Sequence, residues 1–135
     1  MSDLRYPIGT FRYDGPLTDD RRAEAIRSIA ALPARVRRAV EPLSEERLGR
    51  PYRPGGWTVR QVVHHLPDSH LNAYTRFKLA LTEEEPTVRP YDEARWAGLP
   101  DSALAPDVSL RLLEALHERW VELLRGIEGD GWRLR

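Results

Sequence analysis

The side chains best suited to metal binding or proton transfer are the four histidines, His64, His65, His70 and His117. The first three lie within seven residues of one another. A neutral imidazole is a common ligand of zinc and similar metals, and its pKa near neutrality also suits proton transfer. Because the chain contains no cysteine, thiolate nucleophiles and cysteine-bound zinc are excluded, and any metal would need His, Asp or Glu ligands.

Helical spacing predicts different positions for neighbouring histidines. At about 100° per residue from Val59, His70 lies at the centre of the apolar face and should point into the helical bundle. This position fits a hydrogen-bonded core histidine or a pocket-lining one. His64 is predicted to face solvent, where Asp68, four residues later, could form a surface ion pair with it.

His65 is predicted at the edge of the apolar face, about 140° from His70, on a polar stripe with Ser69, Asn72 and Arg76. A polar stripe at this place fits either the wall of a cleft or an ordinary boundary between core and solvent. The ring of His65 is therefore the first candidate for a site, with the stripe residues and His70 as candidate pocket-lining groups.

His117 is predicted on a later helix with Glu114 three residues before it, which is the i, i+3 spacing of metal sites in helical bundles. One such pair does not make a metal site, so a core or interface histidine is the alternative. No G-x-S-x-G, P-loop, dinucleotide fingerprint or H-E-x-x-H is present, which leaves serine hydrolases, NTPases, dehydrogenases and zincins without support.

The elements that position these residues are predicted to be helices. Residues 1–17 indicate an extended arm with four apolar side chains that could anchor it, namely Tyr6, Ile8, Phe11 and Tyr13. A first helix should follow Thr18, with Pro33 kinking or restarting it. Ser44 should cap a short turn through Leu48, and residues 50–56 form a loop.

The helix that carries three histidines has a clear predicted start. Thr58 and Gln61 form a T-x-x-Q capping box, and the apolar spacing continues to about Leu81. Pro67 should interrupt this helix and bend it beside His64 and His65.

A long connection, residues 83–107, should hold one turn at residues 91–96, and connections of this length usually have a function. A third helix should begin at Asp107. It shows a wide apolar stripe comprising Leu110, Leu112, Leu113, Leu116, Trp120, Leu123, Leu124 and Ile127. With no alternating strand pattern and no internal repeat, the chain is predicted to be all-α, an antiparallel bundle forming one domain over residues 1–135.

The composition argues against two classes of binding partner, nucleic acids and membranes. Lys plus Arg equals Asp plus Glu at 21 each, so there is no basic excess for binding nucleic acid. No stretch approaches the ~20 apolar residues of a membrane span, and no secretory signal is present. These features favour a protein that is not exported and that binds neither nucleic acid nor membrane.

The stretch Pro51–His70, with its Gly-Gly-Trp and Asp-Ser-His sequences, resembles the YfiT-type proteins of the DinB-like superfamily. Residues 76–82, 5–9, 89–92 and 112–120 agree with the same family, so the resemblance covers nearly the whole chain. It implies a four-helix bundle in proteins assigned as metal-dependent hydrolases, commonly cytoplasmic homodimers. It also implies that His65, the second of the His-His pair, is one of three histidine ligands of a divalent metal, zinc first, with nickel or manganese as alternatives.

Two departures from the family bear on this expectation. Pro67 stands where the family usually has alanine. The other two family ligands come from an H-x-x-x-H on the fourth helix, and no such sequence occurs here, which predicts a chain that ends before that helix. The sequence therefore fits both an enzyme and a non-catalytic protein.

Three functions follow from the resemblance and its departures. The first is hydrolysis by a metal-activated water, with His65 as ligand. The second is a non-catalytic bundle whose exposed groove mediates self-association or interaction. The third is thiol transfer with a small thiol such as bacillithiol, as in some relatives.

Overall fold

Helices account for the regular structure of residues 3–133, the part of the chain that the computed structural model describes. The three long helices are α1 (Asp19–Val40), α3 (Val59–Thr82) and α5 (Pro106–Arg125). Shorter elements connect or follow them, namely α2 (Glu45–Leu48), α4 (Glu93–Ala97) and the 3₁₀ turns η1 (Pro100–Ala103) and η2 (Gly129–Arg133). The predicted all-α class is confirmed.

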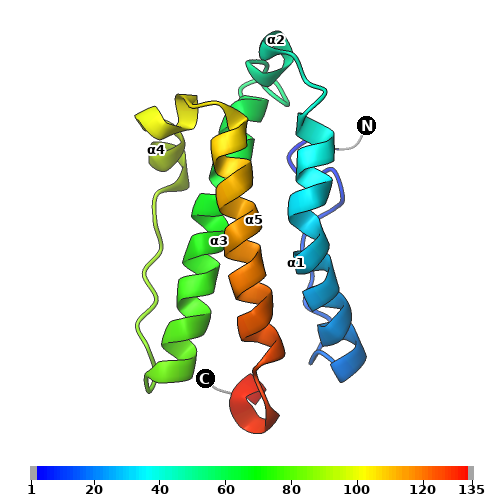
Figure 1. The fold of residues 1–135 in the computed structure, drawn as a ribbon, viewed down its shortest axis with the longest axis vertical. Coiled ribbons are helices and arrows are strands. Elements are labelled where there is room, and N and C mark those ends of the chain that lie inside the picture. Colours follow the sequence, from blue (N-terminus) through cyan, green and yellow to red (C-terminus); the bar gives the residue numbers. More distant parts are fainter. Residues whose placement is uncertain (1–2, 134–135) are drawn as a thin grey trace.

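Helix α5 lies between α1 and α3 and packs against both (Figure 1). Helices α3 and α5 run in the same direction and α1 runs opposite to them (Figure 1). The predicted antiparallel arrangement therefore holds for α1 but is wrong for the pair α3 and α5. The reason is the long connection. Residues 83–92 return along α3, and ten extended residues span about 33 Å, close to the ~36 Å length of a 24-residue helix.

The predicted helix starts are confirmed by their caps. The Thr18 hydroxyl accepts the backbone N–H of Arg21, and Ser44 does the same for Arg47 at the start of α2. Thr58 and Gln61 form both halves of the capping box at the start of α3. Each cap pairs backbone N–H groups that the first turn of a helix leaves without partners.

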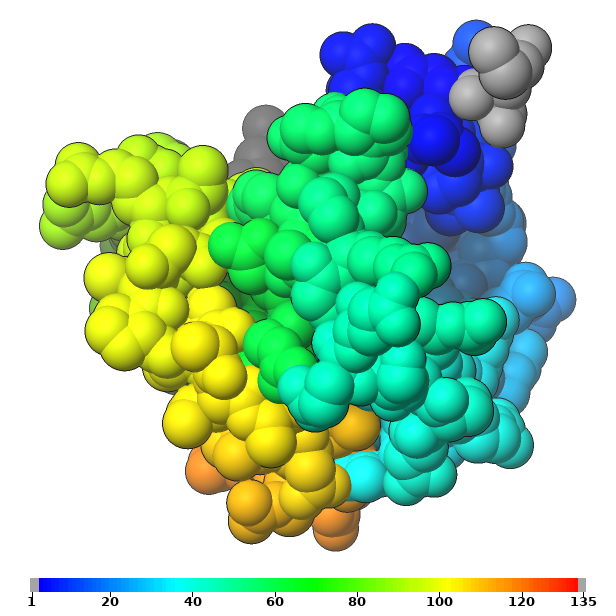
Figure 2. All heavy atoms as spheres, turned by 90° about the horizontal axis from the view of Figure 1, so that it is seen from above, coloured from blue at the N-terminus to red at the C-terminus, as the bar shows by residue number. Residues whose placement is uncertain are grey.

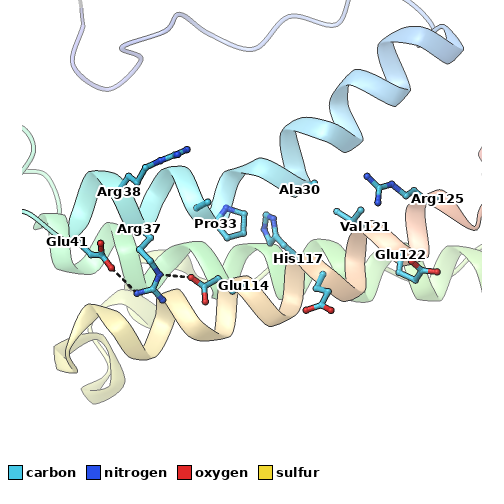
Figure 3. A pocket seen from close by; sticks show the side chains of 12 residues that line it. Ala30, Pro33, Arg37, Arg38, Glu41, Glu114, His117, Val121, Glu122 and Arg125 are labelled. Carbon is cyan, nitrogen blue, oxygen red and sulfur yellow. Dashed lines mark hydrogen bonds and ion pairs between the residues drawn. The ribbon is translucent and has the colours of Figure 1, made fainter.

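Helices α1 and α3 each contain one internal proline, and both prolines are buried. Pro33 lies within α1, which is continuous but changes direction beside it (Figure 3). Pro67 lies within α3, which continues through it to Thr82, so the predicted interruption is wrong. The ring of Pro67 is fully buried, and packing against its neighbours offsets the missing backbone hydrogen bond.

The core consists of two apolar clusters along α5. One joins Val40, Leu48, Val63 and Leu110, and the other joins Tyr74, Leu116, Trp120 and Leu124. Between them, at the middle of α5, lie Leu113 and His117, whose exposed fractions are 1% and 2%. The predicted stripe on α5 is too wide at Leu112, which is exposed.

The N-terminal segment does not bury its apolar side chains. Exposed fractions reach 98% for Ile8, 90% for Phe11 and 74% for Tyr13, so the predicted anchoring is wrong. In the view from above, this segment lies on the side of the molecule away from residues 83–103 (Figure 2). No helix within residues 3–133 is long and apolar enough to cross a membrane.

Candidate functional site

His64 is a structural histidine in the tertiary structure. It is buried, its Nε2–H donates to the Leu104 carbonyl oxygen at 2.7 Å, and its Nδ1 accepts the Ser109 hydroxyl at 2.5 Å. The prediction that His64 faces solvent is wrong, because α3 packs against η1 as well as α5 and therefore buries a wider arc than one helix face. The ring fastens the end of the long connection to α3.

His70 and His117 form a hydrogen-bonded pair across α3 and α5. Nδ1 of His70 lies 2.6 Å from Nε2 of His117. Nδ1 of His117 lies 2.6 Å from the Ile29 carbonyl oxygen of α1. The prediction that His70 points into the bundle is confirmed, and the pair links all three long helices through two imidazole rings.

The Ile29 carbonyl needs this partner because of Pro33. In an α-helix, the carbonyl of residue 29 accepts the N–H of residue 33, and proline has no N–H. The imidazole of His117 supplies the missing donor from another helix. A buried carbonyl without a partner costs about 1–3 kcal/mol, so this contact is an important part of the α1–α5 interface.

The chain of donors sets the tautomers of both rings. Because a carbonyl can only accept, His117 carries its proton on Nδ1 and accepts with Nε2. His70 must then donate from Nδ1, which leaves its Nε2 as a lone-pair nitrogen. The Trp120 ring packs edge-on against His117 at a centroid distance of 5.5 Å, which further limits the rotation of that ring.

These surroundings favour neutral imidazoles. Burial, followed by repulsion from His117 and then His65, lowers the pKa of His70 to about 4. Burial is also the main cause that lowers the pKa of His117, and its bond to the Ile29 carbonyl opposes that shift. Both rings are therefore uncharged at neutral pH.

The pair predicts an acid-sensitive stability. In the unfolded chain His70 titrates near its ordinary pKa of about 6.5, so between pH 6.5 and 4 the unfolded state binds a proton that the folded state does not. Stability should be complete above pH 6.5 and fall as pH decreases toward 4. After allowance for partial exposure, we expect the parent to lose about 1–2 kcal/mol more than His70→Gln between pH 7 and 4.5.

Urea unfolding at several pH values measures this difference, and the subtraction removes the carboxylates that titrate in both proteins. Equal losses in the two proteins would contradict the assignment of His70 as the titrating group.

His65 differs from the other histidines. It is half-buried and packs edge-on against Trp57, with ring centroids 5.0 Å apart. Within residues 3–133 its ring makes no hydrogen bond, whereas the rings of His64, His70 and His117 are all engaged. Within these residues His65 is thus the imidazole with both ring nitrogens available to a ligand or metal, while His70 retains only its Nε2.

Two other residues of the polar stripe on α3, Ser69 and Arg76, contact the long connection. Arg76 donates from Nη2 to the Arg89 carbonyl at 3.1 Å, and Asn72 donates to the Asp68 carbonyl at 2.8 Å. Ser69 lies beside the Tyr91 hydroxyl, whose pKa is raised mainly by burial and lowered in part by that serine. The stripe residues and His65 lie on the same side of α3, but no hydrogen bond joins His65 to them in the described part of the chain.

Glu114 does not act with His117. A cavity of about 610 Å³ lies between α1 and α5, with His117 and Pro33 among its lining residues (Figure 3). At one end Glu114 accepts Arg37 Nε at 2.6 Å, and Arg37 also reaches Glu41 and Asp107. These carboxylates, Glu114 first, raise the pKa of the Arg37 guanidinium. The i, i+3 pair that suggested a metal site is therefore divided between an ion-pair network and the core.

The described residues do not fit a complete metal site. Among residues 3–133 no group of three His, Asp or Glu side chains is placed to hold one ion. Both ring nitrogens of His117 are engaged, and His70 uses its Nδ1, so the pair could offer a metal only the Nε2 of His70. A metal bound at His65 would need ligands from outside these residues.

Sequence reasoning missed two of these arrangements for different reasons. The His117–Ile29 contact had a signal, since a proline four residues after a helical residue leaves a carbonyl that needs a donor. Which donor reaches it, 88 residues away, depends on how α5 packs. The burial of His64 had no local signal, because η1 is a tertiary neighbour of α3.

Known proteins share both the sequence and this fold. Residues 28–134 match the sequence profile of the DinB superfamily. Two relatives, one from Bacillus cereus and one from Bacillus anthracis, are provisionally named metal-dependent hydrolases. Each is 56% identical over 128 residues, which is 95% of this chain and 74% of the relative.

A solved structure agrees with the arrangement of the helices. YfiT from Bacillus subtilis, described as a metal-dependent hydrolase by inference and as a four-helix bundle of unusual topology, superposes with a TM-score of 0.91 at 49% identity. The superposition covers 95% of this chain and 74% of YfiT. The parallel direction of α3 and α5 is consistent with an unusual topology.

Proposed function

Because this chain belongs to the DinB superfamily, we propose that it acts as a hydrolase of the YfiT type on a small-molecule substrate, with His65 as its contribution to a metal site. The supporting observation is the free imidazole of His65, the one histidine ring of residues 3–133 without a hydrogen bond. A metal held there would supply an activated water or thiol when bound. The remaining metal ligands must come from outside residues 3–133, because no group of three His, Asp or Glu side chains within these residues is placed to hold one ion.

In such a site, the residues around His65 would hold its ring and its backbone in place. Trp57 packs against one edge of the His65 ring and restricts its orientation. The helix beneath is held by the capping box at Thr58 and by the His64 contacts to Leu104 and Ser109. A rigid backbone beside the free ring is what a positioned ligand requires.

The test is zinc binding by untagged protein, alone and fused to the quarter of YfiT that this chain does not cover. We expect the chain alone to bind zinc no better than its His65→Ala variant. The fused protein should hold about one zinc, and fused His65→Ala should hold none. Zinc-dependent hydrolysis of small activated esters should follow the same pattern.

The matched control is fused His65→Gln, which keeps a polar side chain on the same helix and should also lose the metal. Zinc retained by fused His65→Ala, or no zinc in the fused parent, would refute the role of His65.

One observation favours a second function, which is association. Ile8, Phe11 and Tyr13 are 98%, 90% and 74% exposed on a segment beside the bundle. Several large apolar side chains exposed close together are typical of a surface that contacts another protein. Sedimentation velocity of the unfused chain over a tenfold range of concentration tests this function, because an association module should show a rising sedimentation coefficient that Phe11→Ser reduces.

A further inference from the structure

The long connection between α3 and α5 encloses a cavity that the metal proposal does not use. Its volume is about 600 Å³, within the range of small-molecule sites. Asn72 of α3 forms one side, and Arg89, Tyr91, Arg95 and Trp96 of the connection form the other. His65 is not among the lining residues. The connection forms the side of the molecule away from the N-terminal segment (Figure 2).

One wall of the cavity is aromatic. The rings of Tyr91 and Trp96 lie 4.5 Å apart at 52° to each other. Tyr91 is half-buried, while 37% of the Trp96 surface is exposed. An indole held in place by a second ring, with part of its face open, is suited to stacking with a flat apolar group.

The charges around the cavity favour an anion. Neither Arg89 nor Arg95 forms an ion pair with any side chain in the described residues. Asp92 is the one acidic lining residue, and its Oδ1 accepts the Arg95 backbone N–H at 3.0 Å as the cap of α4. Arg76 lines an adjoining cavity of about 290 Å³ that shares Asn72, Arg89 and Trp96. The two adjoining cavities are thus lined by three guanidinium groups and one carboxylate, with Glu93 and Asp68 acting on Tyr91 from nearby.

The walls are held in place before any ligand arrives. Arg76 donates to the Arg89 carbonyl at 3.1 Å and Gln61 donates to the Ala97 carbonyl at 3.2 Å. Beyond α4, both Arg60 and His64 bond the Leu104 carbonyl. The connection is therefore tied to α3 on both sides of the cavity, so binding need not order a loose loop.

We propose that this cavity binds an organic anion in which a carboxylate or phosphate group is attached to a flat apolar ring. Arg89 and Arg95 hold the anionic group, since a guanidinium matches the oxygens of either group with paired N–H donors. Trp96 receives the ring, and Asn72 lines the opposite side of the cavity. The cavity between α1 and α5 carries no comparable inference, because its lining holds four glutamates, Glu41, Glu114, Glu118 and Glu122, against three arginines.

The experiment follows the indole N–H signal of Trp96 in ¹H–¹⁵N spectra of the full chain, assigned with Trp96→Phe among the four tryptophans. The probes are phenyl phosphate, benzoate, neutral benzamide and inorganic phosphate. We expect a saturable shift with phenyl phosphate or benzoate, and the tighter of the two identifies the anionic group. Arg95→Gln and Arg89→Gln should each weaken that binding at least tenfold, whereas the exposed Arg27→Gln on α1 should not change it.

Three results would overturn the proposal. The first is benzamide binding as tightly as benzoate, which removes the need for charge. The second is inorganic phosphate binding as tightly as phenyl phosphate, which removes the need for the ring. The third is binding that neither arginine variant weakens, or no saturation at ligand concentrations up to 20-fold above the ~1 mM dissociation constant expected of such small ligands. None of these results depends on zinc or on His65, so the proposed hydrolase function is tested separately.

Discussion

Truncating Leu113 to alanine is expected to lower the free energy of unfolding by about 3–5 kcal/mol, which is a large fraction of the stability of a domain this size. Leu113 is 1% exposed and lies at the middle of α5, between the two apolar clusters. Helix α5 is the element that packs against both other long helices, so a cavity there weakens two interfaces at once. Urea unfolding followed by far-UV circular dichroism measures the loss.

The neighbouring Leu112 provides the matched control. It is the same residue type on the same helix but is 49% exposed, so Leu112→Ala should change the stability by less than about 0.5 kcal/mol. Similar losses for the two variants would show that α5 does not bury the face that the structure assigns to it.

Replacing His117 with phenylalanine is expected to cost about 2–4 kcal/mol even though an aromatic ring is kept. The substitution leaves the Ile29 carbonyl without a donor and the His70 Nδ1–H without an acceptor, and each unsatisfied buried group costs about 1–3 kcal/mol. Urea unfolding of the single variant measures the total.

A double-mutant cycle with Pro33→Ala isolates the carbonyl contribution. Alanine at position 33 restores a backbone N–H four residues after Ile29, so α1 can pair that carbonyl within the helix. His117→Phe should then cost about 1–2 kcal/mol less in the Pro33→Ala protein than in the parent. An unchanged cost would mean that His117 does not compensate for the proline.

The helix ends could be predicted from local sequence because their causes are local. The capping box at Thr58 and Gln61 and the cap at Ser44 formed as predicted, and Thr18 caps the first helix at its predicted start. Each of these contacts joins residues three positions apart. The α3 to α5 direction was not predictable in the same way. Helical periodicity says which face is apolar, but not whether a 23-residue connection turns back at once or returns along the helix.

The candidate site was predictable only in part, for the same reason. Sequence alone identified the histidines as the chemically informative residues, placed His70 in the core and set His65 at a boundary, because helical phase depends only on spacing. It could not find that His64 is buried, that Glu114 pairs with Arg37 instead of acting with His117, or that Arg89, Arg95 and Trp96 share a cavity.

The sequence by itself therefore determined the class of fold, the helix boundaries, the family resemblance and the absence of cysteine chemistry, all of which depend on residue type and short spacing. Only the tertiary structure decided which histidines are free, because a hydrogen bond such as that from His117 to Ile29 joins residues 88 positions apart. Packing of α5 against α1 and α3 uses three imidazoles to satisfy buried polar groups and leaves His65 without a partner among residues 3–133.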